Sequence, residues 1–482
     1  MAEQTLKEKT AKGLFWGGLS NGAQQVLNLV FGLMLARILD ASDYGMVGML
    51  AIFSAIASTI QESGFTAALT NQKEIRHEDY NAVFWFSTLT GVLFYLILFF
   101  CAPLIAQFYD KPELIGLSRI VFLSFLFGGF GIASNAYMFK TLMVKERAKI
   151  DIISLICSGT IGVLLALNGF AYYGLAIQTT AYIGIGSLLK FCYSPWNPTF
   201  LIDWRPLKSM FRFSSKLIVT NVFTQISNNI FSVILGKFYS PRQLGFYSQG
   251  QKWMGMGNSF VGGMINGVAQ PVLVQSVADK DRQRNMFRKM VRFGAFISFP
   301  LMFGFAFVAK EFVLIFLGEK WSPSVLFLQI FCCWGAFWYL QSLYTNLLIS
   351  HGKSDLYLYG VVINSTLQLL FIVCFSYFGI YFMVVGFVIA NVIGLLLWHI
   401  ITNRVVSINL FSVIKDIIPY FVSILVSIIV CHYVLFFIEN IFLLLALKIF
   451  IVSVLYIAIM NYGNSIIFKE CVYFLLKKSS VV

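Results

Sequence analysis

The sequence predicts an all-α polytopic membrane protein with about 14 transmembrane helices, arranged as two pseudo-symmetric six-helix bundles plus a terminal helix pair. Of its 482 residues, 59% are hydrophobic and 12% are charged, whereas a soluble domain carries about 25% charged residues. A soluble fold could not bury this much apolar surface. The apolar residues form long uninterrupted runs, which favour spanning helices over a β-barrel with alternating strands.

Charge and turn signals separate the apolar runs and position each predicted span. In chain order the spans lie near residues 14–38, 44–63, 82–108, 114–139, 150–168, 171–190, 213–238, 244–275, 293–317, 325–349, 356–377, 380–402, 417–437 and 441–462. With a cytoplasmic N-terminus, the loops on the opposite side hold three basic residues, Lys111, Arg242 and Lys320. The basic residues are therefore concentrated on the cytoplasmic side. A missed span would exchange the sides of every later loop and spoil this asymmetry, so it supports the count of spans and predicts that both termini are cytoplasmic.

The overall charge and the cysteines fit the same class of protein. The formal net charge of +14 reflects the basic loops of a membrane protein, and we expect no nucleic-acid partner. The eight cysteines lie in or beside apolar runs without CxxC spacing, which indicates packing instead of disulfides or metal ligands. The first apolar run is too long for a signal-peptide core, so we expect it to be retained.

An internal repeat appears at an offset of 200 residues. The residues Asn21, Gln25, Asn28, Phe31, Leu35 and Gly45 are matched by Asn221, Gln225, Asn228, Phe231, Leu235 and Gly245. Since both copies begin on the same side of the membrane, the repeat is parallel, with its axis along the membrane normal. We therefore expect an N-terminal six-helix bundle at 1–200, a C-terminal six-helix bundle at 201–404, and a terminal helix pair with a cytoplasmic tail at 405–482.

Amide side chains are a shared polar feature of the two repeats. At 100° per residue, Asn21, Gln25 and Asn28 fall within about 60° of one helix face. The second copy has Asn221, Gln225 and Asn228, joined by Asn229. Amides that faced lipid would lose hydrogen bonds, so we expect them to face the protein interior. They could bond neighbouring helices together or line a hydrated cavity, and their matching positions in both bundles favour the cavity.

Charged residues inside the predicted spans are few. The basic ones in or at the ends of spans are Arg37, Arg119, Lys216, Lys237, Lys252, Lys310 and Lys448. Lys252 lies about two turns inside its span and is the hardest to explain by snorkelling to the interface. Glu62, near the inner end of its span, is expected to be the one carboxylate at membrane depth, where it could relay a proton, pair with a cation or simply reach the cytoplasmic interface.

Catalytic signatures are missing from the sequence. The four histidines are scattered, and there is no Walker loop, Rossmann glycine fingerprint or zinc-ligand spacing. The predicted outer loops are also too short to carry an active site. We therefore expect no enzyme activity, no catalytic residue, no cofactor and no metal site.

Several stretches resemble a known family of exporters. They are FWGGLSNGAQQVLNLVFGLMLARILDASDYGMVGM, SGFTAAL, LGFYSQGQKW, RNMFRKMVRF, PLMFGFAFVAKEFVLIFLGEKWSP and HGKSD. Together they cover the first eleven predicted spans, and LDASDYG and GEKWSP are the most specific. The chain resembles the polysaccharide transporter family of the multidrug/oligosaccharidyl-lipid/polysaccharide exporter superfamily, and within it the Wzx-type, colanic-acid-exporter-like flippases.

This resemblance implies a flippase of the bacterial inner membrane that carries polyprenyl-pyrophosphate-linked oligosaccharide repeat units for surface polysaccharide synthesis. Polysaccharide polymerase and chain-length proteins would be its partners, and membrane lipids would surround it. The two groups of amides would then line the glycan cavity. We expect Lys252, with Arg37 and Lys237, to attract the pyrophosphate or acidic sugars, and Glu62 to couple transport to an ion.

Two alternatives remain open. An ion-coupled multidrug antiporter shares the architecture, although it is expected to have membrane carboxylates for cationic drugs, and here cations outnumber them. A membrane polysaccharide polymerase or ligase would need an outer loop with reactive groups, which the sequence lacks.

Overall fold

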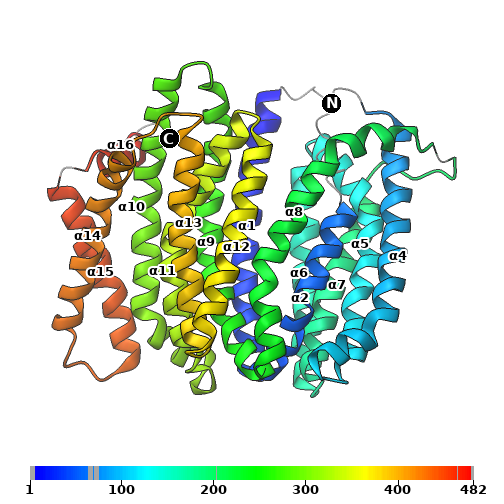
Figure 1. The fold of residues 1–482 in the computed structure, drawn as a ribbon, viewed down its shortest axis with the longest axis horizontal. Helices are drawn as coiled ribbons and strands as arrows, with labels where there is room; N and C mark the ends of the chain where they lie inside the picture. The colour runs from blue at the N-terminus through cyan, green and yellow to red at the C-terminus, as the bar shows by residue number, and fades with distance from the viewer. Residues whose placement is uncertain (1–5, 63–68, 70–74, 202, 464, 479–482) are drawn as a thin grey trace. The chain divides into compact units, whose positions relative to one another are not determined.

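The structure is a computed structural model that describes residues 6–62, 69, 75–201, 203–463 and 465–478. Throughout these ranges the chain forms helices and loops, without a strand (Figure 1). The long helices are α1 (Leu6–Ile38), α2 (Ala41–Glu62), α4 (His77–Tyr109), α5 (Leu114–Lys140), α6 (Val144–Leu167), α7 (Ala171–Tyr193), α8 (Arg205–Phe238), α9 (Pro241–Gln275), α10 (Lys280–Phe312), α11 (Ser324–Ser350), α12 (Ser354–Ser376), α13 (Ile380–Asn403), α14 (Leu410–Val434) and α15 (Ile441–Tyr462). Short turns η1 (Val313–Leu317) and η2 (Glu319–Trp321) follow α10, and α16 (Ile466–Lys478) follows α15.

The helices confirm a polytopic all-α membrane protein. Each predicted span coincides with one of the long helices, and twelve of these are long and apolar enough in their described parts to cross a membrane. The two predicted spans outside the twelve are those of α1 and α9, so the count of about fourteen spans stays a prediction.

Most of the matched stretch SGFTAAL lies outside the described residues. We call the side on which α1 begins the inner side and the opposite side the outer side.

Several helices begin earlier on the inner side than the predicted spans. α6 begins at Val144, with the sequence VKERAK before the apolar run, and α10 begins at Lys280, well before the predicted residue 293. Hydropathy detects only the part of a helix that lies in lipid. Lysine, arginine and glutamate are good helix formers, so these helices continue beyond the apolar segment.

The chain forms two compact units, Met1–Gly245 and Phe246–Val482. In the first unit, α4 packs on α5, α5 on α7, α7 on α6, and α6 on α1, while α2 lies against α5, α7 and α8. Close packing of α1 on α6 depends on Gly159, because a Cβ there would lie 2.5 Å from the ring of Phe31. The predicted boundaries after residues 200 and 404 stay predictions.

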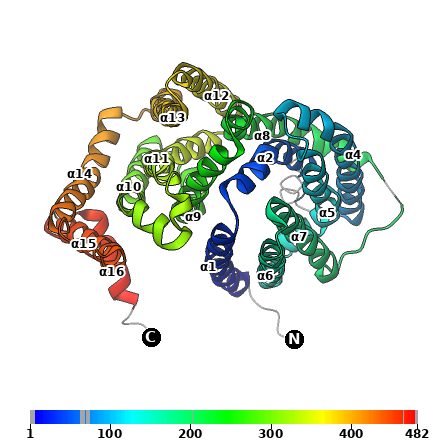
Figure 2. The ribbon, with the colours of Figure 1, turned by 90° about the horizontal axis from the view of Figure 1, so that it is seen from below.

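The second unit repeats the packing order of the first. α10 packs on α11, α11 on α13, and α13 on α12, which corresponds to the order α4, α5, α7 and α6 (Figure 2). This recurrence of packing partners confirms the pseudo-symmetry of the two bundles. The terminal helices α14 and α15 pack on α10 of the second unit.

Ionic contacts attach the terminal helices to α10. The guanidinium of Arg288 donates two hydrogen bonds to Asp416 of α14, at 2.7 and 3.0 Å. Lys289 of α10 pairs with Glu470 of α16 at 2.7 Å. Bidentate contacts of arginine with a buried carboxylate fix both distance and orientation, so α14 is held in one position along α10.

Two glycines at the outer ends of α2 and α9 show the sequence repeat directly. A Cβ on Gly45 would collide with the backbone carbonyl of Pro241, and a Cβ on Gly245 would collide with that of Ala41. All four residues belong to the first unit. Because 41 and 45 correspond to 241 and 245, the contact is isologous, with each glycine facing its counterpart's first turn. Only glycine allows two backbones to approach this closely.

The connection between α7 and α8 is bound to the inner end of α4. The buried side chain of Asn81 donates to the carbonyl of Leu201 at 2.8 Å and accepts from the amide of Thr199 at 2.9 Å. Trp85 also donates to the Thr199 carbonyl, at 2.7 Å. The connection is therefore part of the folded first unit.

Replacing Asn81 by alanine is expected to destabilise the first unit by about 1–3 kcal/mol, because both bonds to the connection are lost and their partners stay unpaired. Unfolding of the detergent-solubilised protein measures this cost. Asn168→Ala is the matched control, since that exposed side chain bonds only its own helix at Leu164. Equal unfolding midpoints for the two variants would contradict the assignment.

The second unit is expected to lose stability as the pH falls, because His351 then becomes protonated. Burial, and then the charges of Lys280 and Lys353, lower the pKa of His351 below its ordinary value of about 6.5. Its Nε2 donates to Gln283 at 2.9 Å, because the amide nitrogen of Gln283 is already bound to a carbonyl. Between the two pKa values the unfolded chain binds more protons, so this stability is present above about pH 6.5 and lost below it. The free energy of unfolding should change less between about pH 7.5 and 5.5 in His351→Gln than in the wild-type protein. An equal change in both proteins would mean that other groups cause the pH dependence.

Candidate functional site

The amide residues of α1 and α8 lie in matching environments. In α1, Asn21 and Asn28 are exposed and Gln25 is half-buried. The second copy is the same: Asn221 and Asn228 are exposed, and Gln225 and Asn229 are half-buried. The sequence repeat therefore extends to the exposure of each side chain.

Within the described structure, these amides do not join helices. Asn229 donates to the carbonyl of Gln225 in its own helix, at 2.9 Å. Over the described ranges, the side chains of Asn21, Gln25 and Asn28 make no hydrogen bond to another helix, and neither do their counterparts in α8. Interhelical bonding would require such contacts. The amide groups are therefore available to water or to a polar ligand.

Two of the predicted cations lie at the outer helix ends. Lys237, in the last turn of α8, pairs with Asp110 at 2.7 Å and lies 5.5 Å from the ring centroid of Phe108. Arg37 is exposed in the last turn of α1. The charge of Lys237 is thus balanced by a carboxylate of the same unit, and an anionic ligand there would compete with Asp110.

Lys252 lies on the second unit, on the glycine-rich helix α9. Its side chain is exposed, and its Nζ lies 5.5 Å from the ring centroid of Trp253. Trp253 is buried and packs edge-on against Phe312 of α10. The packed tryptophan fixes this turn of α9, so the lysine has a defined position at its surface. The side chain of Lys216 lies outside the described residues.

Carboxylates within the helices are more numerous than the sequence indicated. Glu62 ends α2 on the inner side, and its charge interacts with Lys190 of α7. The expectation that Glu62 alone lies at membrane depth is wrong, because Glu311 of α10 is 4% exposed within a candidate span. Its partner is too distant in the sequence to be inferred from the sequence alone.

The partner of Glu311 is Lys448 of α15. The ammonium group donates to a Glu311 carboxylate oxygen at 2.8 Å and to the carbonyl of Phe307 at 3.4 Å. It also lies 4.4 Å from the ring centroid of Phe307. The second carboxylate oxygen of Glu311 is buried without a hydrogen-bond partner among the described residues. The pair therefore links α10 to the terminal helices inside the membrane.

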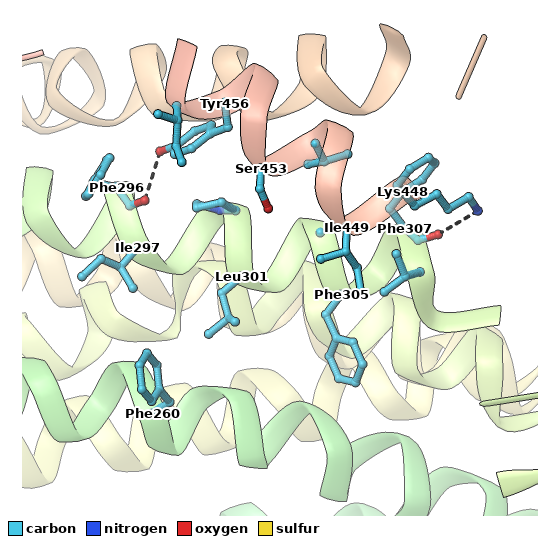
Figure 3. A pocket seen from close by; sticks show the side chains of 15 residues that line it. Phe260, Phe296, Ile297, Leu301, Phe305, Phe307, Lys448, Ile449, Ser453 and Tyr456 are labelled. Atoms are coloured by element: carbon cyan, nitrogen blue, oxygen red, sulfur yellow. Dashed lines mark hydrogen bonds between the residues drawn. The ribbon is translucent and has the colours of Figure 1, made fainter. Parts of the chain in front are cut away.

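An apolar cavity of about 530 Å³ lies between α10 and α15, with a contribution from α9 (Figure 3). Lys448 borders it near the outer side, and Tyr456 closes the opposite part by donating to the carbonyl of Phe296 at 3.0 Å. Aromatic and aliphatic side chains form most of the wall, including Phe260, Leu301 and Ile449. Such a wall suits a hydrocarbon chain and offers few hydrogen bonds to a sugar.

The first unit contains a buried amide that was not predicted from the sequence. Gln61, 4% exposed, donates to the carbonyl of Phe125 at 2.7 Å and to that of Ser87 at 3.4 Å. A Cβ on Gly91 or Gly129 would lie within 3.1 Å of its amide nitrogen. Glycines within the apolar runs of α4 and α5 were the available signal that a polar side chain inserts there.

The described residues contain no cluster of three or more His, Cys, Asp or Glu side chains that could hold a metal ion. Among the described residues, the candidate site instead comprises the amide faces of α1 and α8, the exposed lysine of α9, and the cations at the outer ends of α1 and α8. This arrangement offers hydrogen bonds and positive charge to a ligand.

Relatives of the chain have names connected with surface polysaccharides. Over 357 residues it is 24% identical to teichuronic acid biosynthesis protein TuaB of Bacillus subtilis, with 74% of each chain covered. It is 23% identical to lipopolysaccharide biosynthesis protein WzxC of Escherichia coli, covering 73% of this chain and 72% of WzxC. It is 25% identical to succinoglycan biosynthesis transport protein ExoT of Rhizobium meliloti, covering 66% of this chain and 65% of ExoT.

Solved structures share the fold at low sequence identity. The lipid II flippase MurJ in an inward closed conformation matches with a TM-score of 0.76 and 15% identity, covering 95% of this chain and 99% of MurJ. An inward-facing multidrug resistance transporter of the MATE family matches with a TM-score of 0.64 and 13% identity, covering 79% and 95%. A family of polysaccharide biosynthesis proteins matches residues 34–326, more than half of the chain. On this match, and with the relatives above, the chain belongs to the polysaccharide biosynthesis protein family.

Proposed function

We propose that this protein is a flippase that moves polyprenyl-pyrophosphate-linked oligosaccharide repeat units across the bacterial inner membrane by alternating access. It serves the synthesis of a surface polysaccharide, and both of its termini are cytoplasmic. Polysaccharide polymerase and chain-length proteins take over the product on the outer side. Family membership and the relatives' roles in teichuronic acid, lipopolysaccharide and succinoglycan synthesis support this proposal.

The observation that carries the proposal is the pair of matching amide faces on α1 and α8. Their side chains are exposed or half-buried and are not bonded to other helices in the described structure. An oligosaccharide presents many hydroxyl groups, which need donors and acceptors in place of water. Asparagine and glutamine supply both. A transporter of apolar drugs would gain nothing from these groups.

Flipping can be measured directly in proteoliposomes. A polyprenyl-pyrophosphate-linked oligosaccharide is placed in one leaflet, and an external enzyme reports when its sugar becomes accessible. Faster exposure than in empty vesicles supports the proposal. If several glycans stay inaccessible while cationic dyes are exported, the protein is a multidrug antiporter, the alternative with which it shares a fold.

Lys252→Ala is expected to slow flipping by about tenfold or more, because a charge-assisted contact with the pyrophosphate or an acidic sugar is lost. Arg37 and Lys237 remain candidates for the same ligand at the outer side. The initial rate of sugar exposure, at equal protein per vesicle, measures the effect. Lys415→Ala removes an exposed lysine of α14 and serves as the control. A rate equal to that of the control would remove Lys252 from the proposed site.

A further inference from the structure

Four charged side chains meet at the inner end of the first unit. α2 ends there at Glu62, α6 begins there with Arg147 and Asp151 one turn apart, and α7 ends there with Lys190 in its last turn. Lys190 and Asp151 form an ion pair at 3.8 Å, with side chains 24% and 27% exposed. The charge of Lys190 also interacts with Glu62 and with Arg147. The cluster thus joins three helices of one unit.

The contacts in this cluster are incomplete. The distance of 3.8 Å between Lys190 and Asp151 is longer than a hydrogen bond. The Nε of Arg147 is buried and has no hydrogen-bond partner among the described residues, and its guanidinium lies 5.1 Å from the ring centroid of Phe139. A cluster that only stabilised the fold would satisfy its buried donors. Here the Nε of Arg147 is left unpaired among the described residues, and the contact between Lys190 and Asp151 is long.

The two cations also repel each other. Lys190 and Arg147 are close enough for their like charges to interact, which is unfavourable unless an anion lies between them. Asp151 partly balances the positive charges of both Lys190 and Arg147. A diphosphate carries more negative charge than one carboxylate and has more acceptor oxygens, so it would balance both cations at once.

The depth of the cluster fits a lipid-linked anion. The polyprenyl chain stays in the bilayer, so its diphosphate lies at the level of the membrane surface before transport. Arg147 and Lys190 lie within the first two or last two turns of their helices on the inner side. The sequence-predicted cations Arg37 and Lys237 lie on the outer side, where the substrate arrives later.

We propose that Arg147 and Lys190 form the entry site for the diphosphate of the lipid-linked substrate, and that Asp151 and Glu62 hold these cations while the site is empty. This inference rests on the proposed function. The diphosphate displaces the two carboxylates from the cations as it binds. Neutralising a cation therefore weakens binding, whereas neutralising Asp151 or Glu62 removes a competitor and strengthens it.

The test is a binding titration of the full chain in phosphatidylcholine nanodiscs with a prenyl diphosphate. Lys190→Gln and Arg147→Gln are expected to weaken binding by about tenfold, and Arg147→Lys to retain most of it. Asp151→Asn and Glu62→Gln are expected to strengthen it severalfold. Lys289→Gln and Glu470→Gln are the matched controls, because they neutralise a lysine and a carboxylate of an exposed ion pair in the second unit. Unfolding curves verify that every variant is folded.

The possible outcomes distinguish a failure of the entry site from a failure of the proposed function. Shifts in opposite directions for the cation and carboxylate variants support the site, whereas equal binding by all variants, or losses in all four, overturns it. Inorganic pyrophosphate should compete for binding; if phosphatidylglycerol competes equally well, the site binds phospholipid headgroups and the assignment is wrong. If the wild-type protein flips substrate but binding ignores these residues, only the entry site is lost. If the residues bind prenyl diphosphate as expected but no glycan is flipped, the proposed function is lost.

Discussion

Alanine at Gly45 or Gly245 is expected to lower the free energy of unfolding by about 1–3 kcal/mol and to slow flipping by about tenfold or more. Each added methyl group would collide with a backbone carbonyl, that of Pro241 or that of Ala41. A flexible side chain could move aside, but the carbonyls belong to the first turns of two helices. The helices must separate, which is the cost of overpacking in a tight contact.

The effect on transport follows from where the contact lies. The first turns of α2 and α9 touch at the outer ends of these helices. Alternating access requires the outer ends to approach in one state and separate in the other. A loss of about 2 kcal/mol in the touching state alone changes the ratio of the two states by about thirtyfold. The same loss that lowers stability should therefore also slow flipping.

The double variant and a control make this prediction specific. Once one methyl group has separated the two turns, the second should add little, so the combined cost should be smaller than the sum of the single costs. Gly18→Ala in α1 is the matched control, because nothing lies within 4 Å of a Cβ there; alanine should be neutral or stabilising. Additive costs, or a Gly45→Ala protein as stable as Gly18→Ala, would show that the helices do not touch in the functional protein.

The sequence repeat that pointed to these glycines was visible because its matched positions include amides within apolar helices and a glycine that follows each group of amides. Asn21 and Asn28 stood out because amides are rare in apolar helices, and their counterparts in α8 have the same exposure. Hydropathy positioned the helices because a membrane span needs a long apolar run. Both signals are local, so they can be found without knowledge of which helices are neighbours.

Interactions between distant segments could not be predicted in the same way. Gln61 bonds to carbonyls of α4 and α5, and Asn81 bonds to a connection more than one hundred residues later. A buried polar side chain does not reveal its partner, because many helix pairings would satisfy it equally. For the same reason the cluster of Arg147, Asp151 and Lys190 could not be predicted, because each member resembles an ordinary charged residue of an inner loop.

Lys448→Met is expected to lower the free energy of unfolding of the second unit by about 3–5 kcal/mol. Lys448 provides the one charge that balances Glu311 among the contacts described for it. Without it, a carboxylate that is 4% exposed stays buried in the membrane without a cation, and removing one partner of a buried pair is strongly destabilising. The attachment of α15 to α10 should therefore weaken. Chemical unfolding in detergent measures the loss.

Removing both charges should restore most of the stability. In Lys448→Met combined with Glu311→Met, no charge is left unpaired, and apolar side chains of similar length fill the space beside the cavity. A double-mutant cycle then gives a strong coupling between the two positions. The pair Lys289 and Glu470 is about half exposed, so its cycle should give less than about 1 kcal/mol. A coupling as small as that for Lys448 and Glu311 would mean that water reaches the pair. In that case Arg288 and Asp416, not the ion pair within the membrane, would hold the terminal helices on α10.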